Sequence, residues 1–296
     1  MPELYIQAND LRLAYDEFGN PSDPAMILVM GLGTQMIAWP KDFCQGLAAS
    51  GFRVIRFDNR DIGLSQKMDN ARTPGIAKTV LLSKMGLPVK VPYKLFDMVN
   101  DTIGLMDALG IETAHLIGAS MGGMISQLLA SHFPNRVLSL TSIMSTSGAR
   151  SLPRTPVKIT RQLIRRSQDS SFDAYLENTI RIYRLIGSPD YMPSDDILRQ
   201  KITTSFNRSH HPQGYARHLT AIIASGDRVS ALKKITAPTL VIHGNADVLV
   251  PVQGGIDTAR HIPQSRLELF DGMGHDLPTA LLPRFVELIS EHAASA

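Results

Sequence analysis

The chain has 296 residues, of which 44% are hydrophobic and 19% are charged, and its net charge is only +3. Such values are typical of a folded globular protein of one or two domains, so they exclude a disordered or fibrous chain and give no sign of nucleic-acid binding. A single cysteine, Cys44, excludes an internal disulfide and a thiolate-cluster metal site. The longest apolar run, residues 25–30, cannot span a membrane, and no signal peptide is visible. We therefore expect a cytoplasmic protein without stable membrane insertion.

The first half of the chain alternates short apolar runs with helical patterns. Residues 4–8 and 11–15 flank a turn and predict an antiparallel hairpin. Apolar runs predict buried strands at 26–30, 53–58, 114–118 and 137–144. Helices are predicted at 39–50, 94–109 and 121–133. Because strands joined through helices pair in parallel, the fold class is α/β with an open sheet.

This alternation stops after residue 145. From 146 to 235 the patterns are helical, at 156–167, 172–186 and 214–225, without a convincing strand. Strands return at 239–243 and 266–270, and a last helix is predicted at 277–292. We expect residues 1–145 and 236–296 to form one α/β core and residues 146–235 to form an inserted helical cap. A smaller segment, 66–93, is expected to be irregular.

Ser120 is the candidate nucleophile. It lies in Gly118-Ala119-Ser120-Met121-Gly122, a Gly-x-Ser-x-Gly pattern between a predicted buried strand and a predicted helix. This is the strand-turn-helix setting of a nucleophile elbow, in which the glycines allow close backbone passage and a strained serine. A glycine-rich turn with a helix-capping serine is the plainer alternative.

A serine nucleophile needs an imidazole base oriented by a carboxylate. Of nine histidines, His275 is best placed, in the loop after the last predicted strand, whereas His243 at a strand end is more typical of a core imidazole. Asp247 follows the preceding strand and is the candidate acid, because Asp276 is adjacent to His275 and badly placed to accept its Nδ1–H. The order Ser120, Asp247, His275 is the one expected of an α/β-hydrolase.

Two backbone N–H groups should stabilise the tetrahedral oxyanion. We expect one from Met121, the residue after the nucleophile, and one from Leu32 in the Gly31-Leu32-Gly33 loop. The neighbouring His210-His211 pair has no third ligand at a suitable spacing, so no metal is expected.

The three loops that carry these residues resemble those of the α/β-hydrolase fold superfamily. The stretches 30–40 and 56–65 are similar to a group of bacterial esterases and lipases that includes the anthracycline methylesterases. The resemblance implies a mostly parallel eight-stranded sheet and cofactor-free ester hydrolysis through an acyl-enzyme, with Ser120, Asp247 and His275 as the triad and Leu32 and Met121 as oxyanion donors. Many relatives have His-Gly at Met30-Gly31 and Gly at Asp61.

The chemistry on this triad stays open at several points. A serine at the elbow argues against epoxide hydrolases and haloalkane dehalogenases, which use aspartate there. Carboxylesterase or lipase-like activity on a small ester with an apolar acyl or alcohol group is the main interpretation. Lactonase, thioesterase, C–C hydrolase and perhydrolase activities are alternatives, as is a ligand-binding homologue without turnover.

Two charged features are interpreted as structural. Arg60 and Asp58 are expected to hold a tight turn, with the arginine forking to backbone carbonyls. A basic run could attract acidic substrates or a membrane surface, but the acids that follow it favour a solvated helix face. The run comprises Arg150, Arg154, Lys158, Arg161, Arg165 and Arg166.

Overall fold

The computed structural model describes residues 3–164 and 171–296. Its centre is an eight-stranded sheet in the order β1-β2-β4-β3-β5-β6-β7-β8. Strand pairing is antiparallel for β1 with β2 and β2 with β4 and parallel for all others, which confirms the predicted fold class. The strands are β1 (Leu4–Ala8), β2 (Leu11–Phe18), β3 (Ala25–Val29), β4 (Arg53–Phe57), β5 (Ala114–Ala119), β6 (Val137–Ile143), β7 (Thr239–Gly244) and β8 (Ser265–Phe270).

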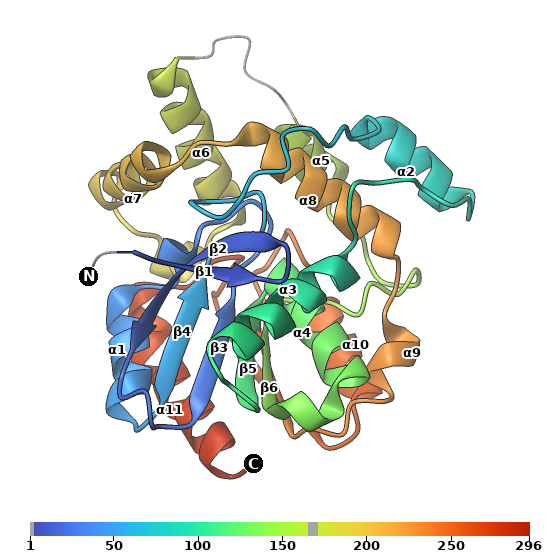
Figure 1. Cartoon of the computed structure of the whole chain (residues 1–296). Helices are drawn as coiled ribbons and strands as arrows, with labels where there is room; N and C mark the ends of the chain where they lie inside the picture. The colour runs from blue at the N-terminus through green and yellow to red at the C-terminus, as the bar shows by residue number, and fades with distance from the viewer. Residues whose placement is uncertain (1–2, 165–170) are drawn as a thin grey trace.

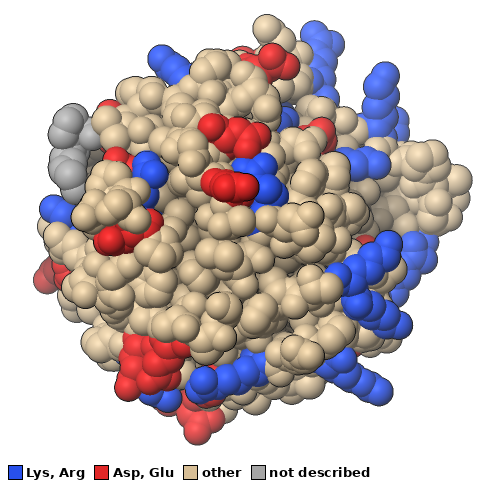
Figure 2. Space-filling model, turned by 60° about the horizontal axis from the view of Figure 1, so that its bottom comes forward, with Lys and Arg blue, Asp and Glu red and all other residues tan. Residues whose placement is uncertain are grey.

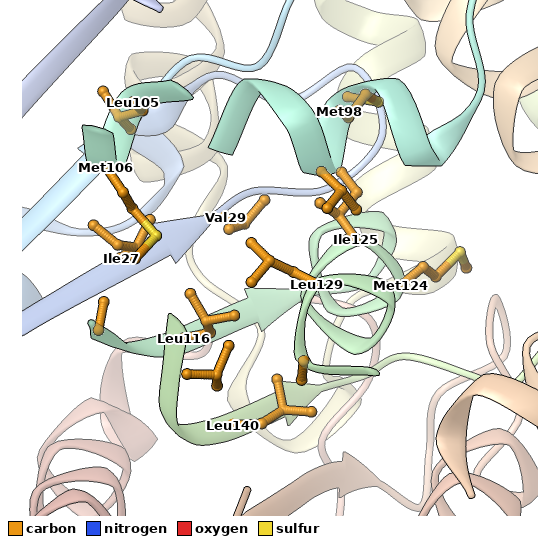
Figure 3. Close-up of a cluster of buried hydrophobic side chains, with 14 of the residues drawn as sticks. Ile27, Val29, Met98, Leu105, Met106, Leu116, Met124, Ile125, Leu129 and Leu140 are labelled. Carbon is orange, nitrogen blue, oxygen red and sulfur yellow. The ribbon is translucent and has the colours of Figure 1, made fainter. Parts of the chain in front are cut away.

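Helices cover both faces of the sheet, as Figure 1 shows. On one face lie α1 (Lys41–Ala49) and α11 (Leu282–Ala294), and on the other lie α3 (Leu95–Ala108), α4 (Met121–His132) and α10 (Gln253–His261). Alternate residues of β3 point to the two faces, so Ile27 and Val29 pack in one apolar cluster and Met26 and Leu28 in the other. Figure 3 shows the first cluster, in which Ile125 and Leu129 of α4 face β3 and β5. Helix α4, which follows Ser120, is thereby fixed against the sheet.

The residues between β6 and β7 that the structure describes form helices and no strand. They are α5 (Val157–Ile164), α6 (Phe172–Ile186), α7 (Asp195–Arg208), α8 (Pro212–Ser225) and the short α9 (Val229–Leu232). We call residues 146–235 the inserted segment. In Figure 1 its helices α6, α7 and α8 lie together at the end of the sheet toward which β4 points. Residues 165–167 of the predicted helix 156–167, with Arg165 and Arg166, lie outside the described residues.

Several element predictions need correction. The segment 66–93 is not irregular throughout, because it contains α2 (Ile76–Lys84). The last helix begins at Leu282 rather than at residue 277. A helix that began at 277 would place Pro283 in its interior, whereas in the first turn of α11 the missing proline N–H leaves no hydrogen bond unmade. Helices α7 and α10 were not predicted at all.

Candidate active site

Ser120 lies between β5 and α4 in a strained conformation, with φ 54° and ψ −116°. A non-glycine residue at positive φ costs about 1–3 kcal/mol and persists only where packing enforces it. Here a Cβ on Gly122 would lie 1.9 Å from the Val29 carbonyl oxygen, and one on Gly118 would lie 2.4 Å from the Gly122 oxygen. Only glycines therefore allow α4 to start this close to β3 and β5, and the elbow lifts Ser120 out of the strand.

His275 connects Ser120 to Asp247. Its Nε2 lies 3.0 Å from Ser120 Oγ, and its Nδ1 lies 2.7 Å from Asp247 Oδ2. Since a carboxylate only accepts, Nδ1 carries the proton and Nε2 is free to accept the serine hydroxyl proton. The structure thus brings together the three residues predicted from separate strand ends.

Asp247 is a buried carboxylate held in one orientation. Its Oδ1 accepts the N–H groups of Leu249 at 2.9 Å and Val250 at 2.8 Å. Burial acts to raise the pKa of Asp247, but the charge and hydrogen bond of His275 and the Val250 N–H outweigh burial and lower the pKa to about 2. Asp247 is therefore ionised at neutral pH, as the acid of a triad must be.

The other histidines considered from the sequence have different partners. His243 is fully buried, donates from Nε2 to the Val250 carbonyl at 2.8 Å, and lies 3.5 Å from Asp247 Oδ2. His211 lies 2.9 Å from an Arg217 nitrogen and 3.4 Å from Asp69. Within residues 3–164 and 171–296, no group of three or more His, Cys, Asp or Glu side chains is arranged to hold a metal ion.

The loop predicted to supply an oxyanion donor lies directly beside the nucleophile. A Cβ on Gly31 would lie 3.2 Å from Ser120 Cβ and 3.7 Å from its Oγ. Met121 is the first residue of α4, where helical N–H groups have no partner within the helix. Leu32 and Met121 thus lie on backbone segments that adjoin Ser120, and their role as donors stays a prediction.

The inserted segment contacts the loop that carries His275. The His275 N–H donates to the Ile186 carbonyl at 2.7 Å, and the Gly274 N–H donates to Ser188 Oγ at 2.8 Å. Ser188 in turn donates from its N–H and its hydroxyl to Asp276. Asp276 therefore holds residues 186–188 of the inserted segment against the base loop, a role that the sequence did not reveal.

A second contact of the inserted segment is a buried ion pair. Arg217 of α8 donates from Nη2 and Nε to the two carboxylate oxygens of Asp61, at 2.7 and 2.8 Å, and the Tyr93 hydroxyl donates to the same carboxylate. Burial acts to raise the pKa of Asp61, but the hydrogen bonds from Arg217, Tyr93 and the Met68 N–H outweigh it, so the pKa is lowered. The turn at Asp61 is thus fixed to α8.

Asp58 and Arg60, the other charged residues of this turn, were predicted to hold it together, and the structure agrees only for Asp58 in the way expected. Asp58 does hold the turn, since its oxygens accept the N–H groups of Met36 at 2.7 Å and Leu64 at 2.9 Å. Arg60 does not fork to backbone carbonyls: Nε and Nη2 donate to Asp101 at 2.5 and 2.6 Å, with one carbonyl bond besides. A carboxylate offers both acceptors in the plane of the guanidinium, and a backbone carbonyl offers one.

Comparison with known proteins gives the family. The family model of the alpha/beta hydrolase fold matches residues 24–278. The chain belongs to the α/β-hydrolase fold family. Rhodomycin D methylesterase of Streptomyces sp. (strain C5) is 26% identical over 100% of this chain and 99% of its own. A 2-hydroxy-6-oxononadienedioate/2-hydroxy-6-oxononatrienedioate hydrolase of Burkholderia vietnamiensis is 26% identical over 95% of this chain and 91% of its own. Among solved structures, the enol-lactonase of Burkholderia xenovorans is similar in fold, with a TM-score of 0.76 and 23% identity over 98% of this chain and 100% of its own.

Proposed function

We propose that the protein hydrolyses carboxylic esters through an acyl-enzyme on Ser120. The hydroxyl proton passes to His275 Nε2 as Oγ attacks the ester carbonyl carbon, and then to the leaving alkoxide as the C–O bond breaks. A water molecule next gives a proton to His275 and attacks the acyl carbon, and the returning proton restores Ser120 while the acid leaves. Leu32 and Met121 would donate their N–H groups to the oxyanion of both tetrahedral intermediates.

The observation that carries this proposal is the unbroken chain of hydrogen bonds from Asp247 through His275 to Ser120, at 2.7 and 3.0 Å. Ser120 also has the strained backbone of an elbow, with φ 54°. A ligand-binding homologue without turnover would have no need to keep the acid, the base and the nucleophile in register. Intact geometry therefore favours an enzyme.

The relatives narrow the ester class without fixing it. A methylesterase matches the chain over its full length, so methyl esters of larger, mainly apolar acids are the first substrates to test. Hydrolysis of lactones and hydrolytic cleavage of C–C bonds are the second candidates for this triad. An enol-lactonase shares the fold, and a C–C hydrolase is similar in sequence. Thioesters and perhydrolysis stay as alternatives. None of these reactions requires a cofactor.

The inserted segment is proposed as the cap over this site, because α8 bonds to Gly33 in the loop beside Ser120 and residue Ile186 bonds to His275. Among residues 3–164 and 171–296 no helix is long and apolar enough to cross a membrane. On the face drawn in Figure 2, Lys and Arg are most numerous toward the right and lie interspersed with acids elsewhere, so no continuous basic surface suggests nucleic-acid binding there. A cytoplasmic location stays a prediction.

The test measures acyl transfer directly. Wild-type protein is assayed with p-nitrophenyl esters of increasing acyl length, a set of aryl and alkyl methyl esters, a lactone, an acyl-CoA and a peracid-forming mixture, beside Ser120→Ala. We expect ester turnover and fluorophosphonate labelling in the wild type and neither in the variant. Ester turnover unchanged by Ser120→Ala would overturn the proposal, and turnover only of a lactone or a C–C substrate would reassign the reaction.

A further inference from the structure

His218 of α8 is a buried histidine outside the triad that contacts the loop beside the nucleophile. Its side chain is fully buried, its Nδ1 lies 3.3 Å from the Gly33 nitrogen, and its Nε2 lies 2.8 Å from the Arg60 carbonyl oxygen. Gly33 follows Leu32, the predicted oxyanion donor. The same helix places the Tyr215 ring against Gly33, since a Cβ there would lie 2.5 Å from the ring. One element of the inserted segment thus packs directly on the oxyanion loop.

The partners of His218 determine its protonation. The Gly33 N–H can only donate and the Arg60 carbonyl can only accept, so Nδ1 must be bare and Nε2 must carry the proton. Burial lowers the pKa of His218 to about 4, which keeps the ring neutral at neutral pH. A protonated ring would lose the acceptor that faces Gly33.

The bond to Gly33 fixes one peptide unit of the loop at both ends. This unit is the Leu32–Gly33 peptide. Its N–H, on Gly33, donates to His218, and its carbonyl, on Leu32, accepts the Thr34 hydroxyl at 3.1 Å. The preceding peptide carries the Leu32 N–H, and its carbonyl, that of Gly31, accepts the Thr34 N–H at 3.3 Å. With the second peptide fixed, rotation of the first about Leu32 is restricted, and so is the direction of the Leu32 N–H.

We propose that His218 is a positioning residue for the oxyanion hole: it holds the Leu32–Gly33 peptide so that the Leu32 N–H points at the oxyanion. The inference rests on the proposed acyl-transfer function, because it assigns a role within that same site. The hydrogen bonds of His218 go to Gly33 and Arg60 rather than to Ser120 or His275. It acts only through the loop, at the point where α8 of the inserted segment meets the core.

Two amide substitutions separate the two hydrogen bonds of His218. In His218→Asn the side-chain oxygen reaches about as far as Nδ1 and can still accept from Gly33, while the bond to Arg60 is lost. In His218→Gln the amide reaches about as far as Nε2 and can still donate to Arg60, while the bond to Gly33 is lost. Each variant therefore serves as the matched control of the other for size, polarity and burial.

The proposal predicts a loss that depends on the bond to Gly33. We expect His218→Gln to lose about tenfold to a hundredfold in kcat and in the rate of fluorophosphonate labelling of Ser120, since a misplaced donor loses much of its value. KM should change less than threefold, and His218→Asn should recover most of kcat. Equal losses in the two variants, a larger loss in His218→Asn, or a change in KM alone would overturn the assignment.

The labelling rate keeps this inference apart from the proposed function. If no ester is turned over but fluorophosphonate still labels Ser120, the ester assignment fails and the comparison of the two variants still tests His218. A further measurement on the wild type covers the case in which a variant does not fold. Hydrogen exchange should find the Gly33 amide protected, whereas exchange as fast as that of an open loop would refute the bond to His218.

Discussion

Replacing Asp247 by Asn tests the site most directly, because the surroundings of the carboxylate determine which way the new amide must turn. Oδ1 faces two close N–H donors, those of Leu249 at 2.9 Å and Val250 at 2.8 Å, whereas Oδ2 faces one close group, His275 Nδ1 at 2.7 Å, with His243 Nε2 farther away at 3.5 Å. An amide NH₂ at the Oδ1 position would meet two donors. The amide oxygen must therefore stay there, and the NH₂ group must face His275.

This orientation forces the wrong tautomer of the base. With an N–H donor opposite, Nδ1 of His275 must be bare, so Nε2 carries the proton and points it at Ser120 Oγ, where it cannot accept the hydroxyl proton. We expect kcat for a p-nitrophenyl ester to fall about 10³- to 10⁴-fold, which corresponds to about 4–5.5 kcal/mol of transition-state stabilisation. KM should change little, since Asp247 is buried behind His275 and bonds to it rather than to Ser120.

The control is Asp107→Asn, which removes an exposed carboxylate paired with Arg136 and should leave kcat unchanged. Circular dichroism of both variants checks that the fold is retained. A kcat within threefold of wild type in folded Asp247→Asn would refute the assigned acid and the argument about the amide orientation. A loss of the same size in Asp107→Asn would show that the assay reports folding rather than chemistry.

The same substitution has a consequence for pH. The pKa of Asp247 is lowered from 3.8 to about 2, so the ionised form stabilises the folded state above the ordinary carboxyl pKa, and that stability is lost as the pH falls from about 4 through 2. The group contributes about 2 kcal/mol to the free energy of unfolding at neutral pH. Denaturant titrations should find a steeper loss between pH 4 and 2 in the wild type than in Asp247→Asn, and equal slopes would contradict the lowered pKa.

Three further predictions follow from packing and charge. Arg217→Met should lower the free energy of unfolding by about 3–5 kcal/mol in urea titrations, because it leaves buried Asp61 without a cation; a loss below 1 kcal/mol would contradict this. Gly122→Ala should abolish folding or activity, since the new Cβ would lie 1.9 Å from a backbone oxygen, whereas Gly75→Ala, with no atom within 4 Å, should leave the melting temperature within a few degrees. Burial raises the pKa of the Cys44 thiol to about 12, so iodoacetamide at pH 8 should neither label the folded protein nor reduce turnover, and rapid inactivation would disprove the burial.

The parts of the fold that could be predicted from sequence are those with a local cause. Strands β3, β5 and β7 are buried on both faces, so their residues are apolar except for His115 in β5 and Thr239 and His243 in β7. The elbow has its glycines within two residues of Ser120. The candidate base His275 and the candidate acid Asp247 could be proposed because both follow strands whose ends meet at one edge of the sheet. In each case a few neighbouring residues carry the signal.

The missed helices lack such a signal for physical reasons. In α7 only Leu198 and Ile202 are buried, so its apolar stripe is too narrow to show a period. In α2 the apolar side chain of Leu81 is 59% exposed and the one fully buried residue is Thr79, which inverts the expected pattern. Helix α10 begins with Gly254 and Gly255, which lower the helix propensity of its first turn. These glycines let α10 pack closely on Thr146 and His243.

The roles of His218, Arg217 and Asp276 could not be assigned from sequence, because the partners that define those roles are 88 to 185 positions away. His218 bonds to a residue 185 positions away and Arg217 to one 156 positions away, while Asp276 bonds to a residue 88 positions away. No motif relates such pairs. They become visible only once the inserted segment is docked on the core.

These contacts also limit how the proposed cap can open. Moving α8 away from the core would break the Arg217–Asp61 pair and both hydrogen bonds of His218 at once. An opening that left Asp61 uncompensated would cost about 3–5 kcal/mol, so fewer than about one molecule in a hundred would be open at equilibrium. Since α8 thus behaves as a fixed wall of the site, substitutions at its contacts should act mainly on kcat. Substitutions in α2, whose residues make none of these bonds, should act mainly on KM and on the choice of acyl group.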